Sequence, residues 1–188
     1  MATQKLFMLL VGCKPKGRHT EQHDILFTIG NNLKSILPDI KSFWPDSGSL
    51  HLDVWREVTE CEGFSISIVP ITKSESVKKE KLKLFFLNLG GYKPGEFEEY
   101  HYKMVIAAEN KSIAIKKAKS SAFYLHTGFK GAESHIDDKY GIDVDDIYNI
   151  EDILPEHIKT QFKISITENN KAAKDKWHIG YTNLSKIK

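Results

Sequence analysis

The sequence contains few cysteines and no long apolar run. Only Cys13 and Cys61 occur among its 188 residues, and two thiols cannot supply the disulfide framework of a small secreted domain. No apolar run approaches the roughly 18 residues that a membrane-spanning helix requires. The apolar stretch LFMLLV near the N-terminus is short and is followed by no small-residue cleavage site, so it predicts a first strand, not a signal peptide. We therefore expect a cytoplasmic protein that makes no membrane contact.

A large excess of charge of one sign is also missing. The net charge is +2, and the positive excess lies in residues 161–188, which carry six basic and two acidic side chains. A charge of this size is a weak argument for nucleic acid binding. Apolar residues make up 40% of the chain and charged residues 28%, which is typical of a folded globular protein and not of a disordered one.

The chain contains an internal repeat. A shift of 78 residues places LFMLLVGCKPKGRHTEQHD on LFFLNLGGYKPGEFEEYHY. Between 6–32 and 84–110 eight positions are identical without a gap, namely Leu6/Leu84, Phe7/Phe85, Leu9/Leu87, Gly12/Gly90, Gly17/Gly95, Glu21/Glu99, His23/His101 and Asn32/Asn110. After an insertion in the second copy the match resumes at a shift of 84, where HLD (51–53) meets HID (135–137). Such a fixed period indicates duplication of one structural unit.

Each copy predicts the element order β-β-α-β-β. Short apolar runs rich in β-formers predict strands at LFMLLV, ILFTIG, HLDVWREV and FSISIVPI, and in the second copy at LKLFFLNL, HYKMVIAA, HIDDKYGI and FKISIT. Apolar spacing predicts a helix after Asn31 and Asn32, shortened or kinked by Pro38, and another after Asn110. We expect an α+β fold of two tandem repeats related by a pseudo-twofold axis, with antiparallel sheet and helices on one face.

The predicted organisation has four segments. The first repeat covers 1–71, a polar linker 72–83, the second repeat 84–168, and a basic C-terminal segment 169–188. The acidic stretch DVDDIYNIEDILPEHI is interpreted as a detour before the last strand of the second repeat. It begins like a calcium-binding loop, but Tyr148 and Leu154 occupy the positions that require Gly and Glu.

The stretch GCKPKGRHTEQHD (12–24), with the later His-x-Asp, resembles an uncharacterised bacterial domain family of unknown function. The features that carry the resemblance are a strand ending in Gly, a Pro-Gly turn, a Glu-Gln-His-Asp stretch and His-x-Asp, and they cover most of the chain. The resemblance supports the fold and implies no mechanism.

The polar residues that both copies share form a candidate site. Glu21 and His23 lie two residues apart on a strand, as do His51 and Asp53, so each pair shares a face. Their counterparts in the second copy are Glu99, His101, His135 and Asp137. Such a group could bind Zn²⁺ or another divalent ion, or act as a general acid and base. Its presence in both copies favours a third interpretation, a structural hydrogen-bond network.

Residues that differ between the copies mark a possible ligand site in the first one. The candidates that the second copy lacks are Cys13, Lys14, Arg18, His19 and Asp24. A thiolate beside cations could be a nucleophile, although a lone cysteine after a strand is more often a small buried hydrophobe. The cations, with Lys16, could hold an anionic small molecule or an RNA phosphate, or form a solvated hairpin tip.

The expected function is a non-enzymatic module that binds a partner or a small ligand. The alternatives are a metal-dependent or Cys/His hydrolase-type enzyme in the first repeat, and RNA binding through the 14–18 turn and the tail KAAKDKWHIGYTNLSKIK. That tail also reads as an edge strand with a solvated flank. A homodimer is compatible with the sequence, and no motif identifies a cofactor.

Overall fold

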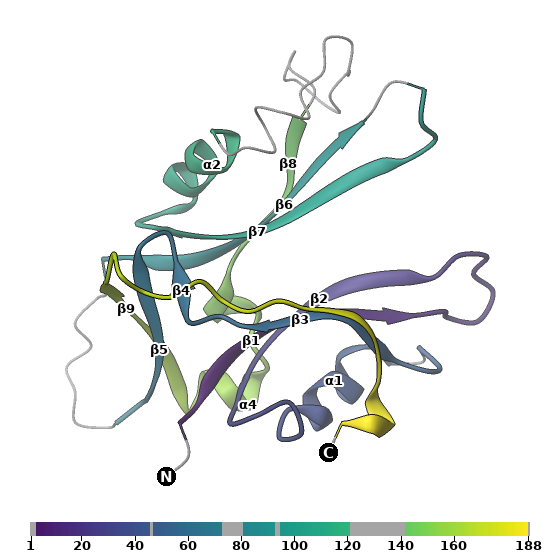
Figure 1. Cartoon of the computed structure of the whole chain (residues 1–188), viewed down its shortest axis with the longest axis horizontal. Coiled ribbons are helices and arrows are strands. Elements are labelled where there is room, and N and C mark those ends of the chain that lie inside the picture. Colours follow the sequence, from purple (N-terminus) through teal and green to yellow (C-terminus); the bar gives the residue numbers. More distant parts are fainter. Residues whose placement is uncertain (1–2, 46, 73–80, 93–94, 121–141, 188) are drawn as a thin grey trace. The chain divides into compact units, whose positions relative to one another are not determined.

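The structure is a computed structural model that describes residues 3–45, 47–72, 81–92, 95–120 and 142–187 (Figure 1). Within these ranges the elements are, in order, β1 (Lys5–Cys13), β2 (Gln22–Gly30), α1 (Leu37–Phe43), β3 (His51–Glu57), β4 (Glu60–Cys61), β5 (Phe64–Pro70), β6 (Lys83–Tyr92), β7 (Glu99–Ala108), α2 (Lys111–Lys119), β8 (Ile142–Asn149), η1 (Ile150–Ile153), α4 (Glu156–Lys159), β9 (Phe162–Glu168), β10 (His178–Asn183) and η2 (Leu184–Lys186). All pairings between these strands are antiparallel. The predicted α+β class is confirmed. None of the helices in the described part of the chain is long and apolar enough to cross a bilayer.

The chain divides into two compact units. Unit 1 comprises Met1–Lys78 and Ile153–Lys188, and unit 2 comprises Lys79–Asp152. The predicted linker 72–83 lies largely outside the described residues, and its last residue, Lys83, begins β6.

The main sheet of unit 1 has the strand order β10-β3-β1-β2, and α1 covers one of its faces (Figure 1). Ile36 and Ile40 of the helix region pack there against apolar residues of the strands, which are Phe7, Leu9, Val11, Leu26 and Leu52. Pro38 lies in the first turn of α1, where its missing N–H is harmless. Ile36 is the N-cap and its side chain makes no capping hydrogen bond. Asn32 instead accepts from the backbone N–H of Ser35, 3.0 Å away, in the turn before the helix.

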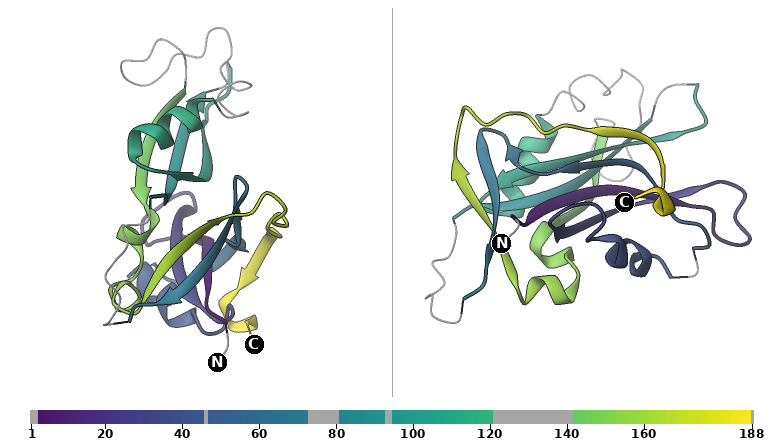
Figure 2. Two further views of the ribbon diagram at one scale, coloured as in Figure 1. Left: turned by 90° about the vertical axis from the view of Figure 1, so that its left-hand side faces the viewer. Right: turned by 60° about the horizontal axis from the view of Figure 1, so that its bottom comes forward.

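The basic C-terminal segment supplies β10, an edge strand of this sheet (Figure 2). Its approach to β3 is fixed by Asp175, whose side chain is 1% exposed and lies 3.1 Å from Arg56 Nη1. Asp175 also accepts from the backbone N–H and the hydroxyl of Thr59. Arg56 in turn covers the ring of Trp177, 4.8 Å from its centroid. The C-terminal segment is therefore folded into unit 1, in agreement with the edge-strand interpretation.

The sheet of unit 2 has the order β7-β6-β8, and α2 packs on one face of it (Figure 1). Small residues of the helix, Ala114 and Ala118, are fully buried against Phe85, Leu87 and Ile106. Both sheets thus carry a helix on one face, as the sequence predicts.

The two sheets share a topological detail. β1 lies between β2 and β3 with a register shift between Leu10 and Val11, so that Asp53 is unpaired in the ladder. β6 lies between β7 and β8 with a shift between Asn88 and Leu89, where the register passes from Asp146 to Val144 and Asp145 is the extra residue of β8. Each shift is a β-bulge, a feature that re-aims a side chain.

The third described strand of unit 2 is β8, which pairs with β6 and lies mostly within the stretch interpreted as an acidic detour. The strand expected at HIDDKYGI lies outside the described residues except for Ile142, the first residue of β8. Acidic residues have low β propensity. Here the packing of Val144 and Ile147 against the core of unit 2 outweighs that low propensity. His135 and Asp137 lie outside the described residues. Asp143 is the residue opposite Gly90, and Asp145 is the residue at the bulge.

The last strand of the predicted second repeat also lies elsewhere. β9 pairs along its whole length with β5 of unit 1, where Ser67 is opposite Ser165 and Ile66 is opposite Ile166. Unit 2 therefore ends at Asp152, and not at the predicted residue 168. The reason is that the apolar residues of FKISIT meet those of FSISIVP in this pairing.

A buried carboxylate in unit 1, that of Asp39, is paired with two side chains. Asp39 is 9% exposed, accepts a hydrogen bond from the hydroxyl of Thr28, and has Oδ1 3.2 Å from His157 Nε2. Buried polar groups are normally paired in this way.

Asn110 caps α2, as the sequence predicts, by accepting from the backbone N–H of Ile113 at 3.0 Å. We expect Asn110→Ala to reduce the free energy of unfolding by about 1 kcal/mol, because an orphan N–H of the first turn loses its acceptor. Asn110→Ser should retain most of the stability. Urea denaturation of both variants provides the check, and equal losses would contradict a capping role.

Candidate metal site

Two histidines of unit 1 lie in one row across three strands. His23 on β2 is opposite Gly12 on β1, and Gly12 is opposite His51 on β3. Side chains of directly opposite residues project from the same face of a sheet. Because Gly12 has no side chain, the space between the two imidazoles is left to their own ring atoms and to neighbouring carboxylates.

Two carboxylates complete the cluster. Asp53 Oδ2 lies 3.1 Å from His23 Nε2 and 3.3 Å from His51 Nε2. Glu21 directs one oxygen to each imidazole, with Oε1 3.2 Å from His51 Nε2 and Oε2 3.6 Å from His23 Nε2. The four residues predicted from the sequence are therefore brought together, and both histidines converge through the same ring nitrogen.

The buried half of the cluster lacks hydrogen bonds. The side chain of His51 is 5% exposed, yet neither its Nε2 nor Asp53 Oδ2 has a hydrogen-bond partner among the described residues. An unpaired buried polar atom costs about 1–3 kcal/mol. Arg56 Nε, Asn88 Oδ1 and Asn149 Oδ1 also lack a hydrogen-bond partner among the described residues, but His51 Nε2 and Asp53 Oδ2 differ from them in lying together, 3.3 Å apart. Both atoms nevertheless lie at ion-pair distance from their neighbours in the cluster, so four ligand-type side chains meet at one point.

Gly12 is required for this convergence. A Cβ at this position would lie 2.4 Å from His51 Nε2 and 2.7 Å from Asp53 Oδ2, closer than any real contact. The bulge in β3 contributes as well, because it places Asp53 beside His51 on the same face. The identity of Gly12 and Gly90 was visible in the sequence, but its steric reason was not.

Sequence analysis missed one residue of the site. Tyr181 on β10 stacks on His51, with ring centroids 4.6 Å apart and an interplanar angle of 29°. The ring restricts the orientation of the imidazole while 67% of Tyr181 stays exposed. The only sequence signal was an aromatic residue in the strand-like part of the tail, and nothing there indicated a pairing with β3.

The predicted site residues that are specific to the first copy do not join the cluster. Lys14, Arg18 and His19 are exposed in the turn between β1 and β2. Asp24 accepts from the backbone N–H of Ile25 at 2.7 Å, and strand alternation places it on the face opposite to His23.

Cys13 is fully buried. Burial, and then the nearby Glu21 carboxylate, raise the pKa of its thiol, which lowers the thiolate fraction at neutral pH. We expect Cys13 to react with iodoacetamide more slowly than a free thiol by at least an order of magnitude, and no faster than Cys61, which is also buried. Mass-spectrometric labelling of the native protein, with the urea-unfolded protein as the fully reactive control, measures both rates. Rapid, selective labelling of Cys13 would restore the nucleophile hypothesis.

The second copy forms a related group. His101 Nε2 on β7 lies 3.4 Å from Asp145 Oδ2 and 3.9 Å from Glu99 Oε2. Glu99 and His101 are thus placed as predicted, but their described partner is Asp145 of β8 and not the His-x-Asp of residues 135–137. His135 and Asp137, the counterparts that the sequence alignment gives, lie outside the described residues, and among the described ones Asp145 and Asp53 occupy corresponding bulges.

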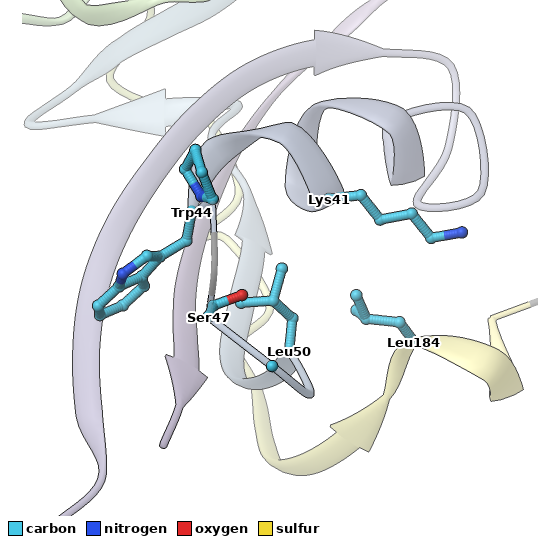
Figure 3. A pocket seen from close by; sticks show the side chains of 7 residues that line it. Lys41, Trp44, Ser47, Leu50 and Leu184 are labelled. Atoms are coloured by element: carbon cyan, nitrogen blue, oxygen red, sulfur yellow. The ribbon is translucent and has the colours of Figure 1, made fainter. Parts of the chain in front are cut away.

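A pocket of unit 1 lies apart from these clusters (Figure 3). It has a volume of about 450 Å³ and is lined by Lys41, Trp44, Pro45, Ser47, Gly48, Leu50 and Leu184. Figure 3 shows Lys41 and Trp44 at the end of α1, and Leu184 on the C-terminal segment across from them. Among the described residues, its lining offers one charged group, Lys41, and no carboxylate, imidazole or thiol.

Comparisons with known proteins agree with the resemblance seen in the sequence. A family model described as Domain of Unknown Function (DUF1543) matches residues 18–68, which include Glu21, His23, His51 and Asp53. The likeness to an uncharacterised domain family is therefore confirmed for this part of the chain. No curated protein matches.

A solved structure shows the same fold. The crystal structure of the protein Il1583 from Idiomarina loihiensis is similar to this chain with a TM-score of 0.57 and 23% sequence identity. The similarity covers 96% of this chain and 97% of that one. At this identity it supports the fold alone.

Proposed function

We propose that this protein binds a divalent transition-metal ion through Glu21, His23, His51 and Asp53. The observation that carries the proposal is the convergence of His51 Nε2 and Asp53 Oδ2, both buried and without hydrogen-bond partners, on the same space as His23 and Glu21. The small ligand of the expected binding module is then a metal ion.

The spacing of the donor atoms supports a metal site. One donor atom from each of Glu21, His23 and His51 lies within 4.8 Å of the others. Asp53 Oδ2 lies 3.1 Å from His23 Nε2 and 3.3 Å from His51 Nε2, close to the roughly 3.3–3.6 Å that separates the ligand atoms of a tetrahedral Zn²⁺. Ionised carboxylates and neutral imidazoles give the group a charge of −2, which a divalent cation neutralises. Imidazole ligands favour Zn²⁺, Cu²⁺, Ni²⁺ or Fe²⁺ over Mg²⁺ and Ca²⁺.

Four protein donors favour binding over catalysis. Structural zinc sites are closed by four protein ligands, whereas catalytic ones use three and keep a position for water or substrate. The enzymatic alternative, and RNA binding through the tail, stay predictions without a supporting contact.

The repeated topology supports the further proposal that the chain arose by internal duplication. β2-β1-β3 and β7-β6-β8 have the same strand order and corresponding bulges. β5 and β9, which read FSISIVP and FKISITE, pair about Ser67 and Ser165, their corresponding residues. A self-complementary pairing of this kind is expected where two copies of one strand meet about a twofold axis.

Metal analysis of the purified protein tests the proposed function. After chelation and dialysis, the full chain should take up Zn²⁺ at the cluster in preference to Mg²⁺, and a His23→Ala/His51→Ala variant should lose this binding. Elemental analysis gives the stoichiometry and isothermal titration the affinity. Retention of the tightly bound ion by a folded double variant would overturn the proposal.

A further inference from the structure

We infer that unit 2 holds a second, more open metal site, formed by Glu99, His101 and Asp145. The ligand would be a divalent cation bound by one imidazole and two carboxylates, with water at its remaining positions. The inference concerns a separate group of residues, but its chemistry follows the one proposed for unit 1.

The first argument is the position of the ligands in the sheet. His101 is opposite Gly90 in the β6–β7 ladder, as His23 is opposite Gly12 in the β1–β2 ladder. Asp145, like Asp53, is the extra residue of a bulge in the strand on the other side.

The second argument is that unit 2 keeps the same steric requirement. A Cβ on Gly90 would lie 2.4 Å and 2.9 Å from the two carboxylate oxygens of Asp145. Asp145 therefore folds over the bare backbone of Gly90 towards His101, 3.4 Å from its Nε2.

The differences between the clusters predict different coordination. One donor atom from each of Glu99, His101 and Asp145 lies within 4.8 Å of the others. The side chains are 38%, 34% and 27% exposed, in contrast to the buried His51 of unit 1. The position that corresponds to His51, opposite the glycine, is Asp143. With one imidazole and two carboxylates, this site offers harder, oxygen-rich ligands, and its exposure leaves room for water on the ion. It should therefore accept Mn²⁺ or Co²⁺ with bound water, and it should bind Zn²⁺ at least about tenfold more weakly than the site of unit 1.

Co²⁺ and Zn²⁺ titrations of the full chain can separate the two sites. The variants are His51→Ala for unit 1 and His101→Ala for unit 2, with His101→Gln as a milder second variant. His157→Ala is the matched control, because His157 contacts Asp39 and lies in neither cluster. Circular dichroism of the metal-free proteins verifies folding.

Wild type and His157→Ala should bind two equivalents, and each cluster variant one. The Co²⁺ absorption lost in His51→Ala should be intense, as in four-coordinate cobalt, and that lost in His101→Ala weak, as in cobalt with bound water. One equivalent that depends on His51 and not on His101 would overturn the second site and leave the first. One equivalent that depends on His101 and not on His51 would overturn the first site and leave the second. Two equivalents that neither substitution affects would overturn both sites.

Discussion

Replacement of His51 by alanine should lower the affinity for Zn²⁺ more than about 100-fold, because even the loss of an outer partner of a metal ligand costs 10–100-fold. The same substitution should change the stability of the metal-free protein little. His51 Nε2 has no hydrogen-bond partner to lose, and removal of an unsatisfied buried atom offsets the lost contact with Tyr181.

The measurement is a thermal or urea melt of wild type and His51→Ala, each with and without Zn²⁺. At a free concentration 100 to 1,000 times the dissociation constant of the unit 1 site, binding there should stabilise wild type by about 2.7–4.1 kcal/mol, and the variant should lose at least about 2 kcal/mol of this gain. His157→Ala again serves as the control, since it should respond to Zn²⁺ as wild type does.

The opposite result has a clear meaning. A structural hydrogen-bond network, the interpretation that the sequence favours, predicts a loss of about 1–3 kcal/mol in the metal-free variant and no zinc effect in either protein. The two interpretations therefore predict different results in two independent measurements: the stability of the metal-free variant and the stabilisation by Zn²⁺.

The strands and helices of unit 1 were predictable because its apolar residues have a clear period. Phe7, Leu9 and Val11 alternate along β1 and all face the helix, and Ile36 and Ile40 continue that core one helical turn apart. The grouping of Glu21, His23, His51 and Asp53 also followed from the sequence, because each pair is spaced by two residues on a strand.

What failed depended on contacts between distant segments. The stretch IDVDDIYN has too many aspartates to look like a strand, and it forms β8 only because β6 offers a ladder and a core for Val144 and Ile147. For the same reason, the local sequence pattern could not predict that β9 pairs with β5 or that Tyr181 stacks on His51. The bulge at Asp145 could be located only in the ladder, because nothing in the sequence marks where the register of β8 shifts.

The substitution Gly12→Ala should abolish tight metal binding and destabilise the metal-free protein by about 1–3 kcal/mol, as overpacking does. The added methyl group would collide with His51 Nε2 and Asp53 Oδ2. The backbone of Gly12 cannot retreat, because it is paired with His23 on one side and His51 on the other. The imidazole must therefore rotate, and its nitrogen leaves the common point. At an unhindered strand position the same change would stabilise by about 0.4–1 kcal/mol through the unfolded chain, so the expected sign is itself informative.

A double-mutant cycle identifies the cause. In the metal-free protein, most of the penalty of Gly12→Ala should disappear in the His51→Ala background, since the nearest colliding atom is gone and only Asp53 Oδ2 remains close. Contacting residues usually show coupling energies of 0.5–3 kcal/mol, and we expect about 1–2 kcal/mol here. Urea denaturation of the four proteins without metal gives the coupling energy, and Zn²⁺ titration of Gly12→Ala gives the loss of affinity. Additive penalties combined with wild-type zinc affinity would mean that Gly12 does not provide the space in which the cluster converges. The close approach of His51 and Asp53 to the backbone of Gly12 would then have no role in metal binding.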